Sequence, residues 1–288
     1  MKRITGIILI AISAASFGTL AIFGRYAYNE NIDTFTLLFL RFGFSASFMT
    51  LMLILRKEPF PHGRALAQLI GMGGIGYAGQ SFLYLTAIKY ASAGLVALLL
   101  YLYPFFVAIL SMIFLQEKLT RTKAFALALA LFGTALTVGP VSGQLIGAVM
   151  AIVAALGYSI YIIIGANVMK HVSAFQSSTV IFASAGAVYG TLTFANGLHL
   201  PQSNFGWMII AGIVIVSTII PVTAFLAGLE RVGPTNAAML STIEPIITVL
   251  LATILFGDQL APIVLVGGAF ILVAVLLLTR TEMASTDA

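Results

Sequence analysis

The sequence aligns with itself at a constant offset of 141 residues, without a gap. Small and helix-breaking residues recur at matching positions: Gly6 with Gly147, Gly24 with Gly165, Gly71 with Gly212, Pro104 with Pro245 and Leu119 with Leu260. Each copy contains five apolar segments, and because five is odd, the second copy must enter a membrane from the opposite side. We therefore expect one domain over residues 1–288, made of two inverted five-segment repeats, 1–141 and 142–288.

The composition indicates a chain that is solvated mainly by lipid. Of its 288 residues, 60% are hydrophobic and only 8% are charged, and the mean hydropathy is +1.09. A soluble domain of this size cannot bury so much apolar surface. The absence of cysteine excludes disulfides, thiolate metal sites and cysteine nucleophiles. The first apolar run is too long for a cleavable signal and lacks a small-residue cleavage site, so we interpret it as the first span.

Ten apolar stretches of about 18 to 24 residues are each long enough to cross a hydrocarbon core as a helix. We expect them at 4–27, 34–55, 65–87, 92–114, 122–139, 143–165, 175–195, 206–227, 235–256 and 262–279. The expected fold is therefore an all-α integral membrane protein with ten transmembrane helices.

The distribution of positive charge predicts the orientation. With the N-terminus in the cytoplasm, eleven Lys and Arg residues lie at the inner ends of the spans and Lys89 alone lies outside. The eleven are Lys2, Arg3, Arg56, Lys57, Arg64, Lys118, Arg121, Lys123, Lys170, Arg231 and Arg280. We expect both termini in the cytoplasm and a location in a plasma membrane, such as a bacterial inner membrane. Because these charges lie in short loops, the net charge of +5 indicates topology and not nucleic-acid binding.

Four stretches carry a resemblance to a known family: SFGTLAIFGRYA, TLLFLRFGFSA, AIKYASAGLVALLLYLYPFFVAILSMIFLQEKLT and GLERVGPTNAAMLSTIEPIITVLLATILFGDQL. In these the chain resembles the EamA-type members of the drug/metabolite transporter superfamily, although Phe17 and Tyr158 stand where that family usually has tryptophan. The resemblance implies export of small metabolites through the lipid bilayer, and the most similar branch exports amino acids, including aromatic ones. Other members carry sugars, nucleotide derivatives and cationic drugs, so carriers for sugars, nucleosides or drugs are the alternatives.

Three charged residues lie well inside the expected spans: Arg25, Arg41 and Glu244. A charge at that depth needs a partner or a wet cavity. Arg25 is close to the outer end of the first span, where its side chain can reach the interface. For Arg41 we favour an ion pair with the acidic outer loop, which carries Glu30 and Asp33, over binding of a substrate carboxylate.

Glu244 stands directly before Pro245 near the middle of the ninth span. Proline removes a backbone donor and frees the carbonyl one turn back, so it bends a helix. Three roles are open for the acid: binding a substrate ammonium group, carrying a coupled proton, or hydrogen bonding across helices. The equivalent residues of the first copy are Tyr103 and Pro104, so the repeat itself does not demand an acid.

Polar and aromatic residues recur at helical spacing on one face of the third span, where Tyr77, Gln80, Ser81 and Tyr84 align. Packing of the rings, or bonding of the hydroxyls to their own helix, is the alternative for each residue. Together they favour a central polar and aromatic cavity lined by the first, third, fourth, sixth, eighth and ninth spans. The candidate lining residues are Ser16, Tyr77, Gln80, Tyr84, Tyr101, Tyr158, Ser241 and Glu244, with Pro104 and Pro245 as the bending points.

Several other functions are disfavoured. His62, His171 and His199 lie in separate loops and make neither a metal site nor a catalytic triad, and no nucleotide-binding motif is present, so we expect no cofactor and no enzyme. A lipid-modifying membrane enzyme would need clustered polar residues near an interface, and a channel or receptor would not need an odd inverted repeat. Substrate, proton coupling and oligomeric state stay open, and a monomer is compatible with the pattern.

Overall fold

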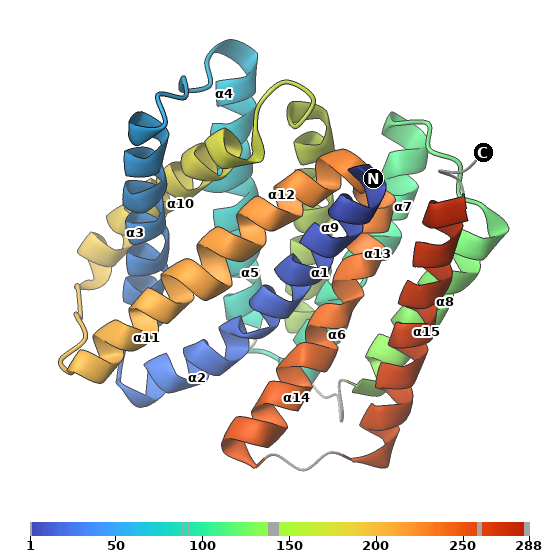
Figure 1. Ribbon diagram of the computed structural model, residues 1–288. Helices are drawn as coiled ribbons and strands as arrows, with labels where there is room; N and C mark the ends of the chain where they lie inside the picture. Colours follow the sequence, from blue (N-terminus) through green and yellow to red (C-terminus); the bar gives the residue numbers. More distant parts are fainter. Residues whose placement is uncertain (1, 88, 92, 138–143, 258–260, 285–288) are drawn as a thin grey trace.

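The computed structural model describes residues 2–87, 89–91, 93–137, 144–257 and 261–284, and every regular element within them is a helix (Figure 1). The first copy contains α1 (Lys2–Gly18), α2 (Leu20–Asn29), α3 (Thr34–Leu55), α4 (Gly63–Gly71), η1 (Met72–Tyr77), α5 (Ala78–Ala87), α6 (Ala93–Leu100), α7 (Tyr103–Phe114) and α8 (Arg121–Thr137). The second copy contains α9 (Leu145–Val168), α10 (Ala174–Asn196), α11 (Asn204–Val214), η2 (Ile215–Ile219), α12 (Ile220–Val232), α13 (Pro234–Leu240), η3 (Ser241–Ile243), α14 (Glu244–Phe256) and α15 (Pro262–Ala284).

Within the described residues, eight helical stretches are long and apolar enough to cross a membrane. The expected spans at 65–87 and 122–139 are helical where they are described but are not among the eight. The described part of α8 has 17 residues, fewer than the roughly 20 that a span needs. The stretch from α4 to α5 is diluted by glycine and polar residues. An all-helical integral membrane protein is thus confirmed, and the count of ten spans stays a prediction.

Large apolar side chains stand exposed on the outside of the helices, as expected for a surface in contact with lipid. Ile75 is 79% exposed, Ile254 is 74% exposed and Phe114 is 68% exposed. Water would penalise such a surface heavily, whereas hydrocarbon solvates it.

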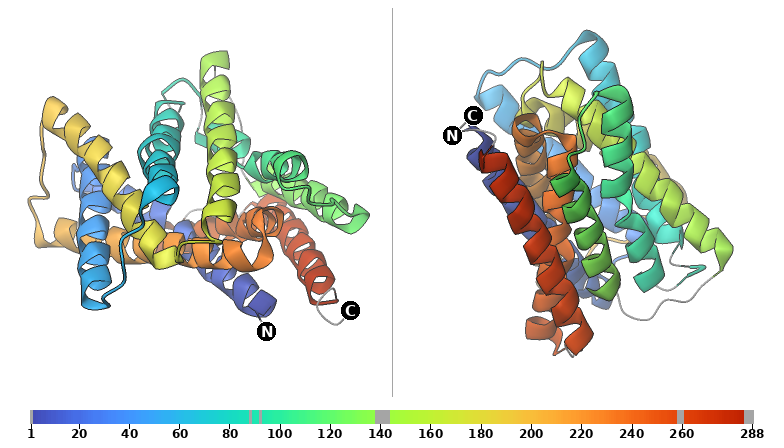
Figure 2. Two further views of the ribbon diagram at one scale, coloured as in Figure 1. Left: turned by 90° about the horizontal axis from the view of Figure 1, so that it is seen from above. Right: turned by 90° about the vertical axis from the view of Figure 1, so that its right-hand side faces the viewer.

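Helices far apart in the sequence pack in pairs. The helix α1 packs against α12, and its counterpart α9 packs against α5; α3 packs against α10, and α8 against α15. If each helix is replaced by its equivalent in the other copy, the contact of α1 with α12 becomes that of α9 with α5. The pairs α3 with α10 and α8 with α15 each consist of two equivalent helices, so they stay the same. Figure 1 and the view from above in Figure 2 place α3 with α10 at one edge of the molecule and α8 with α15 at the other. The remaining helices form the centre.

Two ends of the bundle can be told apart. The first turn of α1 and the last turn of α15 lie at the same end, which we name the proximal end (Figure 1). The loop between α2 and α3 and the start of α11 lie at the opposite, distal end. The expected peripheral position of the fifth and tenth spans agrees with the place of α8 and α15, where Gly133 brings its backbone close to Gly267.

Candidate functional site

The fourth and ninth spans are each interrupted near their middle, at equivalent positions. Two residues separate α6 from α7, and the 3₁₀ turn η3 separates α13 from α14. Pro104 and Pro245 stand in the first turn of α7 and α14, where the missing N–H needs no partner. Helices broken at matching positions of two repeats are the best pointer to a transporter's binding site.

The third and eighth spans carry π-helical segments at overlapping positions. The 141-residue offset moves η1 onto residues 213–218, and four of these belong to η2. A π segment leaves carbonyl groups without their usual partners and is often found at functional sites. In η2 the hydroxyl of Thr218 supplies one replacement by donating to the carbonyl of Ile213 at 2.7 Å.

Glu244 opens α14 with its side chain half-buried. Among the described residues, none donates a hydrogen bond to its carboxylate and no cation forms an ion pair with it. Its backbone is fixed, because Thr248 Oγ1 lies 3.2 Å from the Glu244 carbonyl and 3.0 Å from that of Gly18. A side chain at Gly18 would lie 3.1 Å from the same Glu244 oxygen, so the close approach of α1 needs glycine.

Tyrosine hydroxyls surround this carboxylate at electrostatic range. They belong to Tyr77, Tyr84, Tyr101, Tyr103 and Tyr158. Tyr84, Tyr101 and Tyr158 are half-buried, and no described residue hydrogen-bonds to their hydroxyls. An acid and several phenols without protein partners can together bind a polar or cationic group of a solute.

Four of the rings on this side of the site form a continuous wall. The rings of Tyr77 and Tyr161 stack with centroids 5.8 Å apart, and Tyr161 stacks on Tyr158 at the same separation. Tyr158 then meets Tyr103 edge-on at 4.9 Å. Offset-stacked and edge-to-face arrangements are the favourable ones for aromatic pairs. The wall runs from η1 through α9 to the start of α7.

Tyr103 connects the two broken spans. Its hydroxyl donates to the carbonyl of Ala238 in α13 at 3.4 Å and is hydrogen-bonded to the side chain of Ser241. Ser159 of α9 donates in turn to the Tyr103 carbonyl at 3.1 Å. Tyr103 and Tyr161 were not among the lining residues predicted from the sequence, although Tyr103 is the repeat equivalent of Glu244 and Tyr161 lies three residues after Tyr158.

The other candidate lining residues are Ser241, Gln80 and Ser16. Ser241 is buried and donates to the Ala237 carbonyl at 2.9 Å, the bonding to its own helix that was the alternative for hydroxyl residues. Gln80 and Ser16 are half-buried, and the described residues make no hydrogen bond to either side chain. The structure thus brings Tyr77, Tyr84, Tyr101 and Tyr158 toward Glu244, and the function of this set stays a prediction.

Arg41 does not pair with the acids of the loop before α3, so that expectation was wrong. Arg41 as a whole is 4% exposed, and its guanidinium donates through Nε to Thr218 Oγ1 at 2.7 Å. Through Nη2 it donates to the Tyr77 hydroxyl at 3.1 Å and to the Ser217 carbonyl at 3.4 Å. These acceptors lie deeper in the bundle than the loop acids do, and a planar guanidinium can serve several of them at once. The second span therefore contacts the third and eighth spans through Arg41, although it was not among the spans predicted to line the cavity.

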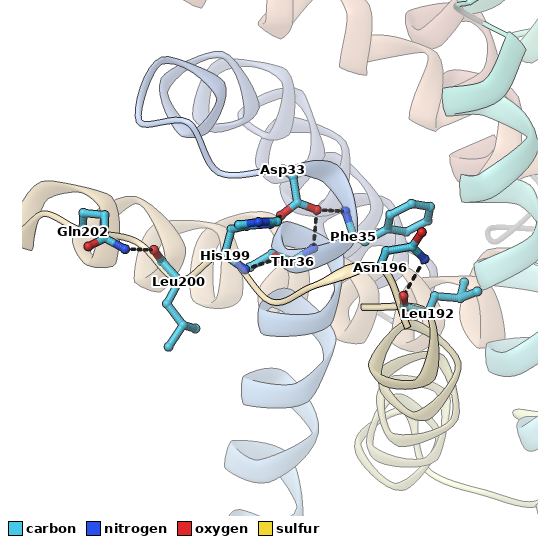
Figure 3. A network of polar contacts seen from close by, with 8 residues as sticks. All are labelled: Asp33, Phe35, Thr36, Leu192, Asn196, His199, Leu200 and Gln202. Atoms are coloured by element: carbon cyan, nitrogen blue, oxygen red, sulfur yellow. Dashed lines mark hydrogen bonds and ion pairs between the residues drawn. The ribbon is translucent and has the colours of Figure 1, made fainter. Parts of the chain in front are cut away.

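The two loop acids bind the other copy instead, at the distal end. Glu30 accepts a hydrogen bond from Ser203. Asp33 caps α3 by accepting from the backbone of Phe35 at 2.9 Å and of Thr36 at 3.1 Å, and it faces His199 Nδ1 at 3.3 Å (Figure 3). Burial alone would raise the pKa of Asp33, but the hydrogen bonds from Thr36, His199 and Phe35 outweigh it and lower that pKa below its usual value.

Arg25 is exposed on α2, and its guanidinium lies 4.0 Å from the centre of the Phe256 ring. Its expected interfacial position stays a prediction. Across the described residues, His, Asp and Glu form no group that could hold a metal ion.

Broken helices, paired π segments and an acid among phenols characterise the candidate site, and the apolar helical bundle around it is that of a membrane protein. The chain matches the EamA-like transporter family twice, over residues 4–139 and 145–280, and it belongs to that family. It is accordingly a membrane transporter, and the two matches follow the two copies of the sequence repeat.

Individual relatives agree with this assignment. An uncharacterized transporter of Archaeoglobus fulgidus is 30% identical over 273 residues, which are 94% of this chain and 95% of the relative. The uncharacterized transporter YcbK of Bacillus subtilis is 24% identical, with 91% and 88% covered. Protein LicB of Haemophilus influenzae is 27% identical, with 70% and 69% covered. A solved crystal structure shares the fold, with a TM-score of 0.83 at 18% identity over 97% of this chain and 98% of that one.

Proposed function

We propose that the protein is a secondary transporter that exports small metabolites carrying an ammonium group, with amino acids as the first substrates to test. The observation that carries the proposal is Glu244, a half-buried carboxylate without a partner among the described residues. An ammonium group would supply the hydrogen bonds and the charge that this carboxylate lacks, and the tyrosine wall would accommodate an apolar or aromatic remainder. The solute would leave unchanged, without enzymatic conversion.

Alternating access would follow from the repeat. The proposal takes residues 1–141 and 142–288 as two inverted five-span repeats related by a pseudo-twofold axis in the membrane plane. The exchange of helix contacts between the copies, α1 with α12 against α9 with α5, supports it. Two similar halves can adopt each other's conformations and so expose one site to either side in turn.

The proposal places the protein in a plasma membrane, such as a bacterial inner membrane, with both termini in the cytoplasm. The first turn of α1 and the last turn of α15 lie at the same end of the bundle, which is compatible with this orientation (Figure 1). The excess of Lys and Arg at the inner ends of the expected spans indicates that this end faces the cytoplasm. The proximal end would then face the cytoplasm.

The decisive experiment is transport by liposomes that contain the purified protein. Phenylalanine, leucine, glucose and uridine are offered, with and without a pH gradient. Phenylalanine or leucine flux should saturate. Glu244→Gln should raise the apparent KM roughly tenfold or more, because a hydrogen bond to a charged group contributes about 1.5–3 kcal/mol and 1.4 kcal/mol is a factor of ten.

The matched control is Glu230→Gln, since Glu230 is an acid at the exposed end of α12, 3.6 Å from Arg231. It should leave KM unchanged. Equal kinetics of Glu244→Gln and wild type would remove Glu244 from the site. If only glucose or uridine were transported, the proposal of an ammonium-bearing substrate would be wrong, and the protein would carry another class of solute.

A second role for Glu244 is to carry a coupled proton. It is favoured by the absence of any described cation that would hold the carboxylate in its charged form. In that case an imposed proton gradient should drive accumulation by the wild type, and Glu244→Gln should abolish that coupling while downhill flux persists.

A further inference from the structure

Arg41 is a buried charge whose described partners include no carboxylate. The residue is 4% exposed, and its guanidinium relies on one hydroxyl of each copy and one backbone carbonyl. A buried cation without a counter-ion is costly, and several neutral acceptors are needed to keep it in place. Such an arrangement needs a reason beyond the stability of α3.

The hydrogen-bond partners of Arg41 belong to the two π-helical segments. Tyr77 is the last residue of η1, and Ser217 and Thr218 lie in η2. Thr218 Oγ1 accepts a hydrogen bond from Arg41 at 2.7 Å and donates its own hydrogen to the Ile213 carbonyl, so the two bonds are compatible. One guanidinium from α3 therefore connects the irregular turns of the third and eighth spans.

Through Tyr77 the same guanidinium reaches the candidate site. The Arg41 guanidinium lies 5.8 Å from the centre of the Tyr77 ring, and that ring begins the wall that continues through Tyr161 and Tyr158. The Tyr77 hydroxyl is also within electrostatic range of both Arg41 and Glu244. Phe42, next in sequence to Arg41, supports the other side of Tyr77 with ring centroids 5.3 Å apart.

We propose that Arg41 is a positioning residue of the transport site, which fixes the Tyr77 end of the tyrosine wall and holds η1 and η2 together. The site it serves is the one in the proposed function, and the inference rests on that proposal. Arg41 itself does not touch the solute. Its effect reaches the solute through the orientation of Tyr77.

The first test measures anchoring without any substrate. Hydrogen–deuterium exchange is followed in peptides that cover residues 72–77 and 215–219. Arg41→Gln should accelerate exchange in both peptides, Tyr77→Phe only in the first, and Thr218→Val only in the second. Ser45→Ala is the matched control, because Ser45 is buried one turn further along α3 and its hydroxyl donates to its own helix at the Arg41 carbonyl. Unchanged exchange in Arg41→Gln would overturn the proposal.

The second test measures transport in liposomes, with whichever of phenylalanine, tetramethylammonium, glucose and uridine the wild type carries. Arg41→Gln should raise the apparent KM about tenfold, the scale of one lost hydrogen bond to a charged group. The maximal rate per folded protein should stay within about twofold. Arg41→Lys should recover part of the loss, since it keeps the charge but not the planar fork.

A double-mutant cycle separates positioning from general weakening of the fold. If Arg41 acts through Tyr77, the effects of Arg41→Gln and Tyr77→Phe on KM should be non-additive. The effects of Arg41→Gln and Glu244→Gln on KM should be additive. Additive effects of the first pair, or a normal KM in Arg41→Gln, would contradict the inference. Normal KM in Glu244→Gln together with the Arg41 effects would instead contradict the proposed role of Glu244 alone.

Discussion

Tyr103 and Glu244 are equivalent residues of the two repeat copies, and the structure brings the phenol of one within electrostatic range of the carboxylate of the other. Each stands directly before a proline, at the start of the second half of a broken helix. The pair therefore locates the candidate site where both copies contribute the same structural element with different chemistry.

The two members of this pair differ in their hydrogen-bonding partners. Tyr103 bonds to the backbone of Ala238 and to Ser241, and so links the two spans. Glu244 makes no such link among the described residues. One copy thus supplies a link between the two broken spans at this position, and the other supplies a carboxylate without a partner among the described residues.

We predict that the two interruptions are required for turnover. Replacing Pro104 or Pro245 by alanine restores a backbone donor and favours one continuous helix, because proline is about 3 kcal/mol less favourable than alanine inside a helix. The maximal transport rate should fall roughly tenfold, with a smaller change in KM. The rate is measured in liposomes at saturating solute.

Pro262→Ala is the control for both variants. Pro262 begins α15 at the surface, away from both interruptions in the sequence, and its replacement should leave the rate unchanged. Normal turnover in both Pro104→Ala and Pro245→Ala would show that the breaks are only a consequence of packing.

A second prediction concerns the glycine at the contact of η1 with α10. A β-carbon at Gly73 would lie 2.9 Å from the Cα of Ile181 and would also meet the backbone oxygen of that residue, which cannot move aside. Gly73→Ala should therefore destabilise the protein by about 1–3 kcal/mol, the usual cost of overpacking. Gly79→Ala, two residues into α5 with open space around it, should be neutral or stabilising by up to about 1 kcal/mol.

Thermal unfolding in detergent separates the two glycine variants. A lower Tm for Gly73→Ala and an equal or higher Tm for Gly79→Ala is expected. Equal Tm values for both would mean that α10 moves away from η1 at little cost.

The positions of the spans could be predicted from the sequence because each is specified locally. Helix α3 has the bounds expected, 34–55, since an uninterrupted apolar run follows the capping Asp33. The break before Pro245 is likewise a local property. The interruption of the first span at Gly18 and Thr19 was not predicted, because it depends on contacts of Gly18 with α14 and of Thr19 with Ser217 at 2.7 Å.

The partners of Arg41 could not be predicted for the same reason. Thr218 lies 177 residues away in the sequence, and no local pattern links it to an arginine of the second span. The acids that are near in sequence were the natural choice, but each is engaged at the distal end. Tyr161 could have been included, since it lies close to one turn after Tyr158 and shares its face.

A third prediction concerns acid sensitivity at the distal end. The pKa of Asp33 is lower in the folded protein, so its contribution to stability is present above the pKa of the unfolded chain, about 3.9, and is lost as the pH falls through the folded value. Asp33→Asn should remove this part of the acid dependence. Asp33→Ala should cost about 0.5–2 kcal/mol near neutral pH, as for other helix N-caps.

The measurement is the Tm between neutral pH and pH of about 3, on either side of the reference value. His199→Ala should have a smaller effect, because the bonds from Phe35 and Thr36 to the carboxylate stay in place. If the Tm of Asp33→Asn declines with acid as steeply as that of the wild type, other carboxylates determine the acid limit.

The last prediction concerns closure of the proximal end. Thr235 Oγ1 in the first turn of α13 donates to Glu117 Oε2, after the end of α7, at 2.6 Å, and so joins the two copies. Ala108, Met112 and Leu119 lie next to this bond. Thr235→Val keeps the shape but removes the donor, so conformations open at this end should become more populated.

Cysteine labelling can measure this opening, since the chain contains no cysteine of its own. A cysteine introduced at Ala108, which is 2% exposed, should react with a maleimide several-fold faster in Thr235→Val, up to the roughly tenfold that a lost bond to a charged group allows. Thr235→Ser should restore the slow rate, and Thr120→Val in the adjacent loop should leave it unchanged. Equal labelling in Thr235→Val and wild type would show that the hydrogen bond does not hold this end closed.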